Sequence, residues 1–240
     1  MNLRNDCEEQ FKKVIDISRN DELITEYYSD LNRLFSGIYI LNYLSKRIEL
    51  KDTFETYYFK ISLSCLLEAY SLIINNYPRG AALVLRSSLE NYLKHIISLS
   101  NNPQFLVHDR SYSANKKTFE KMINENYSPS LSSICTSINS KMEDVYNNLS
   151  GLSHSLTAQS QSNILEYFSD IHIVKNDNVY WVFIKFNEII TAFFSLSLIA
   201  CQFSLKSWDS GELVEIMRFV FGRRKTNTYL NLLKENVYSC

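Results

Sequence analysis

Arg86 and Glu90 stand four residues apart in the apolar segment LRSSLENYL. On an α-helix this spacing places a guanidinium and a carboxylate on one face. Charges rarely enter a protein core unpaired, so one interpretation is a structural ion pair that fixes helix packing. In the other, Arg86 is a ligand for phosphate or carboxylate that a rigid element presents.

His154 lies in the polar segment NLSGLSHSLT, just past a predicted helix end. An imidazole titrates near pH 6.5, which suits a general acid or base at neutral pH, and its protonated form can bind phosphate. The alternative is an exposed or helix-capping histidine without a catalytic role. Arg86, Glu90 and His154 are the candidate catalytic residues.

A second candidate site is a basic run near the C-terminus that is interleaved with aromatic residues. It consists of Arg218, Arg223, Arg224 and Lys225 around Phe219, Phe221 and Gly222. Such runs are typical of solvated helix ends. The alternative is contact with an RNA backbone or with the acidic surface of a partner.

Metal and cofactor sites are not predicted. His95 follows Arg86 by nine residues, which is a rotation of about 180° on a helix, so the two cannot share a site within one chain. His108 and His172 have no second ligand at helical or strand spacing. The five cysteines are widely spaced without a CxxC or CxxH pair, and we interpret them as reduced thiols of a cytoplasmic protein.

Composition restricts the fold that positions these residues. The 240 residues include only 5 glycines and 3 prolines, which excludes glycine-rich phosphate loops and makes an all-β fold improbable. The formal net charge of −1 argues against a protein that coats nucleic acid by bulk electrostatics. An all-α protein remains.

Apolar residues recur at spacings of three and four along most of the chain, which predicts a series of amphipathic helices. We expect the helices Thr53–Asn75 and Pro78–Leu99 to form a central antiparallel hairpin, with the second as the central helix of the bundle. A long helix capped by Asp21 precedes them. Three other predicted helices are Lys116–Asn126, Ser210–Phe221 and Thr226–Asn236. A fourth starts at Pro129 and ends before Gly151. A fifth is Asn178–Lys206, where a strand at VYWVFIKF is the alternative.

No repeat, linker or low-complexity segment divides the chain, so residues 1–240 are predicted to form one helical domain that is more than 60% helical. Its core spans about residues 20–160, and C-terminal helices span 178–236. The best membrane candidate is Ile189–Cys201, whose thirteen residues are fewer than the roughly 20 that a bilayer requires. We therefore expect a buried core helix there and no membrane association.

The segments NNYPRGAALVLRSSLENYLKHI and VYNNLSGLSHSLT together resemble the HEPN-like helical proteins of bacterial toxin–antitoxin and phage-defence systems. In many of those proteins, a helix with an Arg…Glu pair is followed by a segment of the form YxxLSxxxH. The matching residues here are Tyr146, Leu149, Ser150 and His154, and the resemblance covers about Leu50 to Leu156. It implies an all-helical architecture and a role in defence.

Two functions follow from these observations. Family members that cut RNA carry an arginine followed four to six residues later by a histidine, a spacing that this chain lacks. The prediction is therefore a helical subunit that acts mainly by binding a protein partner, and its 16 tyrosines, 14 phenylalanines and 2 tryptophans favour such an interface or a homo-oligomer. The alternative is a metal-independent, RNA-binding ribonuclease that uses Arg86 and His154 and needs no cofactor.

Overall fold

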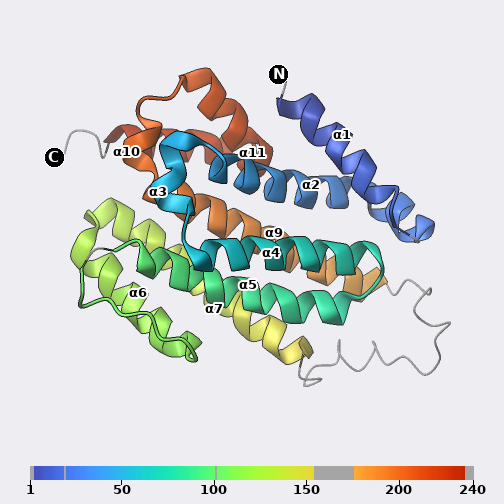
Figure 1. The fold of residues 1–240 in the computed structure, drawn as a ribbon, viewed down its shortest axis with the longest axis horizontal. Helices are drawn as coiled ribbons and strands as arrows, with labels where there is room; N and C mark the ends of the chain where they lie inside the picture. Colours follow the sequence, from blue (N-terminus) through green and yellow to red (C-terminus); the bar gives the residue numbers. More distant parts are fainter. Residues whose placement is uncertain (1–2, 19, 101, 154–175, 236–240) are drawn as a thin grey trace.

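Helices account for 85% of the residues that the computed structural model describes, which are 3–18, 20–100, 102–153 and 176–235. These residues contain no β-strand, so the predicted all-α class is confirmed (Figure 1). The segment VYWVFIKF, for which a strand was the alternative, is helical. The helices are α1 (Leu3–Ile15), α2 (Asp21–Ser45), η1 (Ile48–Leu50), α3 (Lys51–Phe54), α4 (Tyr57–Ile74), α5 (Pro78–Ser98), α6 (Tyr112–Asn126), α7 (Pro129–Ser153), α9 (Asn176–Ala200), α10 (Gln202–Leu205) and α11 (Ser210–Glu235).

The hairpin of α4 and α5 is the most extensive helix pair among the described residues, as the sequence predicts (Figure 1). The Phe59 backbone N–H donates to the Thr56 hydroxyl and caps α4, while Pro78 occupies the first turn of α5. Between the helices, Ser62 and Ser88 hydrogen-bond through their hydroxyls at 3.0 Å. These small side chains let the helices approach closely, so the hairpin provides a rigid support for Arg86 and Glu90.

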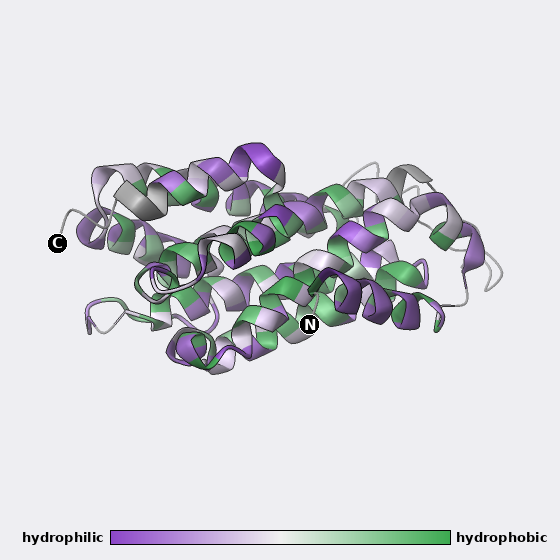
Figure 2. Ribbon diagram, turned by 90° about the horizontal axis from the view of Figure 1, so that it is seen from above, coloured by the Kyte–Doolittle hydropathy of each residue, from purple (hydrophilic) through white to green (hydrophobic). Residues whose placement is uncertain are grey.

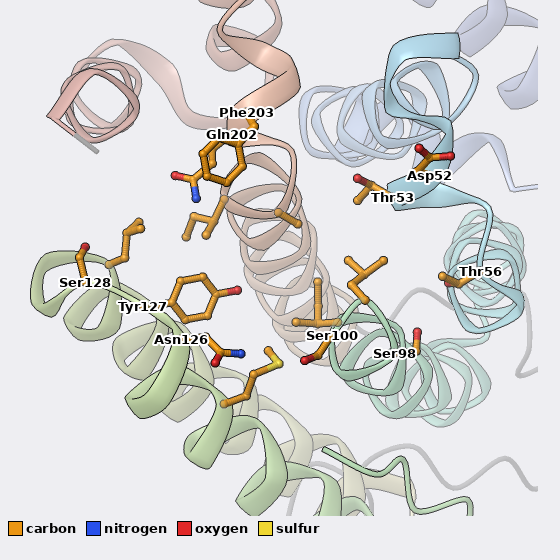
Figure 3. Close-up of a pocket in the computed structure, with 16 residues that line it drawn as sticks. Asp52, Thr53, Thr56, Ser98, Ser100, Asn126, Tyr127, Ser128, Gln202 and Phe203 are labelled. Atoms are coloured by element: carbon orange, nitrogen blue, oxygen red, sulfur yellow. The ribbon is translucent and has the colours of Figure 1, made fainter. Parts of the chain in front are cut away.

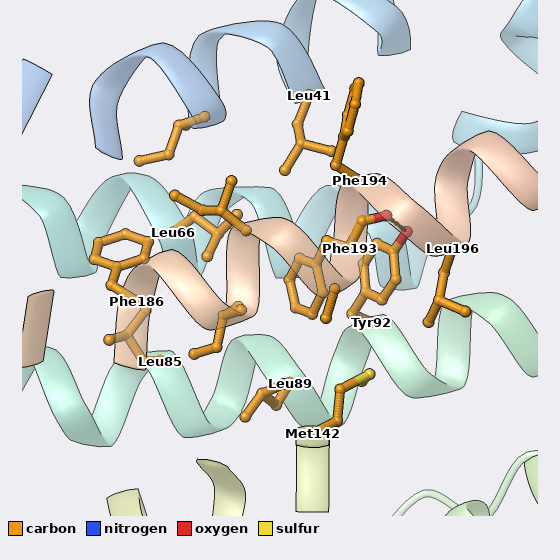
Figure 4. Packing of buried hydrophobic residues seen from close by; sticks show 14 of the residues in the cluster. Leu41, Leu66, Leu85, Leu89, Tyr92, Met142, Phe186, Phe193, Phe194 and Leu196 are labelled. Atoms are coloured by element: carbon orange, nitrogen blue, oxygen red, sulfur yellow. Dashed lines mark hydrogen bonds between the residues drawn. The ribbon is translucent and has the colours of Figure 1, made fainter. Parts of the chain in front are cut away.

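Helix α9 shares the centre of the bundle with α5, which differs from the expectation of α5 as the one central helix. It packs against α2, α5, α7 and α11. The Phe193 ring stacks on Tyr92 with centroids 3.7 Å apart, and the Tyr92 hydroxyl donates to the Phe193 carbonyl oxygen at 2.6 Å (Figure 4). A buried aromatic side chain of α5 and one of α9 therefore meet inside the core.

Helix α2 crosses α9 at a glycine. A Cβ atom at Gly37 would collide with the Ile190 side chain, so only glycine permits this approach. The helix is capped by Asn20, whose side chain accepts from the Leu23 backbone N–H, rather than by the predicted Asp21, which is its first residue. Helix α1 packs on α2, and its buried residues are Cys7 and Phe11. The helix is hydrophilic along most of its length (Figure 2).

Helices α6 and α7 are longer than their patterns predict. Helix α6 begins at Tyr112, with the Ser111 hydroxyl as its cap, and not at Lys116. Helix α7 continues through Gly151 to Ser153, because one glycine near a helix end is tolerated when the residues around it are buried. The Tyr112 ring thereby belongs to a helix and reaches α7.

Helix α11 consists of two helical segments that meet at Gly222, as the predicted helices Ser210–Phe221 and Thr226–Asn236 indicate. Gly222 has φ 69° and ψ 176°, a conformation that is almost exclusive to glycine. The Thr226 hydroxyl donates to the Gly222 carbonyl oxygen at 2.8 Å and supports the second segment. The basic residues on the two sides of Gly222 therefore lie on different helical segments.

By length and composition alone, two described helices could cross a membrane, Tyr57–Ile74 and Val179–Ala200. The second is longer than the thirteen residues Ile189–Cys201, because the helix also contains the segment VYWVFIKF, for which a strand was the alternative. Within an apolar 18-residue window of this helix 72% of the residues are buried in the bundle, as expected for a core helix, whereas only 39% are buried in Tyr57–Ile74. The absence of membrane association remains a prediction.

Candidate functional site

Tyr146 of α7 joins the two predicted charged residues of α5. The Arg86 Nη2 donates to the Tyr146 hydroxyl at 2.8 Å, and this hydroxyl donates to Glu90 Oε1 at 3.0 Å. The Arg86 Nε lies 3.4 Å from the same Glu90 oxygen. The ion pair predicted from the four-residue spacing is therefore present, and a tyrosine from another helix completes it.

Aromatic contacts hold the Tyr146 ring in place. The Tyr112 ring of α6 stacks on it with centroids 3.8 Å apart and planes 4° from parallel, and the Arg86 guanidinium carbon lies 4.8 Å from its centroid. Burial raises the pKa of Tyr112 and of Tyr146, and the Glu90 carboxylate raises the pKa of Tyr146 further. The Tyr146 hydroxyl thus stays protonated and available as a donor.

A second ion pair extends this arrangement along α6 and α7. The Lys116 Nζ donates to Glu143 Oε2 at 2.7 Å, which is the main reason that the pKa of Lys116 is raised, and it lies 3.4 Å from Glu120. We call Arg86, Glu90, Tyr112, Lys116, Glu143 and Tyr146 the α5–α7 polar cluster. It joins three helices by charged groups and aromatic rings.

The predicted pairing of Arg86 with Glu90 is confirmed. The pair is not fully buried, since the two side chains are 24% and 34% exposed. The third predicted residue, His154, lies outside the described residues. Tyr146 belongs to the YxxLSxxxH segment, and that motif is the sequence signal for it. Tyr112 and Lys116 have no comparable signal, because their role depends on the packing of α6 against α7.

Chemically, the α5–α7 polar cluster offers cations that can bind an anion. It contains no histidine or cysteine, and its tyrosines and lysine all have a raised pKa. General acid–base catalysis near neutral pH requires a group that titrates there. The Arg86 and Lys116 side chains are therefore suited to bind an anion, and proton transfer by His154 remains a prediction from the sequence.

His95 is fully buried on the side of α5 that faces α3 and α4, which confirms that it does not share a site with Arg86. Its Nδ1 shares a hydrogen bond of 2.8 Å with the Thr56 hydroxyl, and the Phe54, Phe59 and Tyr92 rings surround it. Burial lowers the pKa of His95 to about 3. The imidazole is therefore a neutral core residue.

We expect this histidine to destabilise the fold in mild acid. Below pH 6.5 the unfolded chain protonates His95 and the folded chain does not, so the free energy of unfolding falls as the pH decreases from 6.5 toward 3. The loss is about 1.3 kcal/mol at pH 5.5 relative to pH 7. Urea unfolding at both pH values measures it, and in His95→Gln the pH dependence should be smaller by that amount. Equal pH dependence in both proteins would contradict the expectation.

The predicted basic run does not form one site. Arg223, Arg224 and Lys225 are exposed on the second segment of α11, where Lys225 lines a pocket of about 500 Å³ between α7, α9 and α11 together with Lys141 and Lys185. Arg218 lies before Gly222 and lines a different pocket, next to α1 and α2. The rotation of the chain at Gly222 separates residues that are close in sequence.

A pocket of about 740 Å³ contains none of the predicted site residues (Figure 3). It lies between α3, the end of α5, the α6–α7 corner and the α9–α10 turn. No lysine, arginine or histidine lines it, and burial raises the pKa of Tyr127 to about 12. Its polar lining residues, drawn in Figure 3, are Asp52, Thr53, Thr56, Ser98, Ser100, Asn126, Tyr127, Ser128 and Gln202.

Among the described residues, no group of three or more histidine, cysteine, aspartate or glutamate side chains is arranged to hold a metal ion. The four cysteines described, Cys7, Cys65, Cys135 and Cys201, are free thiols. Burial is the main reason that the pKa of each is raised, which makes them inert rather than nucleophilic.

The fold and the α5–α7 polar cluster define an all-α bundle with a charged, tyrosine-bridged site. Comparisons with protein-family models, with curated proteins and with solved structures find no match for this chain. The resemblance to HEPN-like proteins therefore remains a prediction from the sequence motifs.

Proposed function

We propose that this chain is a helical subunit of a bacterial anti-phage defence or toxin–antitoxin system and that it acts by binding a protein partner. The resemblance in the Arg86–Glu90 and Tyr146–His154 segments supports the type of system. The observation that supports partner binding is the exposure of Tyr57 and Leu67 on α4, among the polar residues Lys60, Ser64, Glu68 and Ser71.

Helix α4 has the composition of a core helix without the burial of one. Only 39% of its residues are buried, and its charged residues are Lys60 and Glu68. Of its apolar side chains, Tyr57 is 73% and Leu67 is 53% exposed. Helix α4 already packs against α5 inside the chain. The exposed Tyr57 and Leu67 side chains favour an additional contact with another molecule.

A charge at Leu67 should prevent partner binding. We expect Leu67→Glu to abolish co-purification with the product of the adjacent gene when the two are co-expressed, because a carboxylate would be desolvated in an apolar interface. Protection of cells against phage should be lost in parallel. Ile17→Glu, at a residue that is 78% exposed beyond the end of α1, is the matched control and should retain both.

Light scattering separates a hetero-complex from a homo-oligomer, since the wild-type chain alone should be larger than 28.1 kDa only in the second case. A monomeric wild-type chain that co-purifies with no neighbouring gene product would contradict the proposal. So would equal behaviour of Leu67→Glu and Ile17→Glu.

The ribonuclease effector is the second candidate, and the partial exposure of the Arg86 side chain, 24%, favours it. A planar cation held at an angle fixed by Tyr146 and Glu90 is suited to bind a phosphate in two places. In this function, Arg86 stabilises the negative charge of the transition state and His154 transfers the proton. Degradation of RNA in the presence of a chelator would support this candidate.

A further inference from the structure

Three arginines from three helices line one pocket at the junction of α1, α2 and α11. The pocket has a volume of about 380 Å³, and the arginines are Arg4, Arg33 and Arg218. Both α1 and α11 pack on α2, and Arg4 of α1 lies beside Phe219 of α11 (Figure 1). Arg4 and Arg33 are far from Arg218 in sequence, so local pattern groups only Arg218 with a basic site.

The charge of this pocket is strongly unbalanced. Glu8 is its one acidic lining residue, and the Glu8 carboxylate lies 3.3 Å from the Lys12 ammonium on the same helix. Arg33 and Asp30 are 3.8 Å apart at an exposed position, a pair that contributes little and that a better anion can replace. Three guanidinium groups against one carboxylate give the pocket a net charge of about +2.

The neutral lining groups can add hydrogen bonds, and two of the arginines have defined neighbours. The Ser36 hydroxyl donates to the side-chain Oδ1 of Asn32 at 3.3 Å, which leaves the Asn32 side-chain Nδ2 as a donor. The Arg4 guanidinium carbon lies 5.4 Å from the centroid of the Phe219 ring, next to Arg218 in sequence. Phe219 thus holds Arg4 on the same side of the pocket as Arg218.

We infer that the pocket formed by Arg4, Arg33 and Arg218 binds the phosphomonoester group of a small phosphorylated molecule. A phosphomonoester carries a charge of about −1.5 to −2 at pH 7, which matches the pocket better than the single charge of a phosphodiester. Guanidinium groups bind phosphate oxygens in pairs, so three of them can surround one phosphoryl group. The volume also falls within the range of about 300–1,000 Å³ that is typical of small-molecule sites.

The test compares AMP with 3′,5′-cyclic AMP, which has the same base and sugar but a phosphodiester. Titration calorimetry on the full chain at low salt should give a Kd at least about tenfold lower for AMP. Arg4→Gln, Arg33→Gln and Arg218→Gln should each weaken AMP binding about tenfold or more. Arg110→Gln, at an exposed arginine that does not line this pocket, is the matched control and should bind AMP as the wild type does.

A five-nucleotide RNA with a 5′-phosphate, compared with the same RNA with a 5′-hydroxyl, identifies the source of the monoester. Tighter binding of the phosphorylated RNA than of AMP, with the same loss in the three arginine variants, would support the site and assign it to RNA ends. Equal affinity for AMP and cyclic AMP would overturn the inference. AMP binding that none of the three substitutions changes would also overturn it. So would the absence of saturable binding of any phosphomonoester up to about 10 mM, a Kd that corresponds to a binding free energy of about −3 kcal/mol.

Discussion

Replacing Phe193 with alanine should lower the free energy of unfolding by about 3–5 kcal/mol. The Phe193 side chain is buried at the centre of α9 and stacks on Tyr92 at 3.7 Å, so its removal leaves a cavity between α5 and α9 and deletes an aromatic pair. For a chain of this size the melting temperature should fall by roughly 6–20 °C. Circular dichroism during thermal and urea unfolding measures both quantities.

Phe203→Ala is the matched control, because the Phe203 ring is 61% exposed on α10. Its free energy of unfolding should stay within about 0.5 kcal/mol of the wild type. Similar effects of the two substitutions would mean that α9 does not lie in the core.

Replacing Arg86 with alanine should cost about 2–3 kcal/mol, less than the 3–5 kcal/mol typical of a fully buried ion pair. The substitution removes a charge-assisted hydrogen bond to Tyr146, an ion pair with Glu90 and a cation–π contact. Glu90 keeps its bond from the Tyr146 hydroxyl and is 34% exposed, so water compensates for part of the loss. Urea unfolding measures the difference.

Tyr146→Phe tests the bridging hydroxyl separately. It retains the stack on Tyr112 but loses both hydrogen bonds, so we expect a cost of about 1–2 kcal/mol. A negligible effect of both substitutions would show that the α5–α7 polar cluster does not stabilise the bundle.

Two further variants separate the proposed functions. Arg86→Lys keeps a positive charge but loses the planar group that can hold a phosphate in two places. If the chain is a ribonuclease, Arg86→Lys and His154→Ala should each abolish RNA degradation while the melting temperature changes little. If it acts by binding a partner, His154→Ala should protect cells as the wild type does, and this result would end the catalytic interpretation.

Local pattern predicted much of the fold and part of the candidate site. The spacing of apolar residues and the scarcity of glycine and proline predicted the all-α class and the α4–α5 hairpin, because helix formation and capping depend on residues within a few positions. Arg86 and Glu90 are paired for the same reason, since they lie one helical turn apart. Boundaries were less accurate, as at Tyr112 and Ser153, where packing extends a helix beyond its own pattern.

Local sequence pattern therefore predicts the helices and the contacts within one or two turns of each helix. Only the tertiary structure brought Tyr112 and Tyr146 against Arg86, and only it separated Arg218 from Arg223 and placed it with Arg4 and Arg33. These arrangements depend on which helix faces bury the most apolar surface against one another and on the positive φ of Gly222. The spacing of apolar residues along one helix does not specify which helix it packs against. It also does not specify the direction that the chain takes after a glycine.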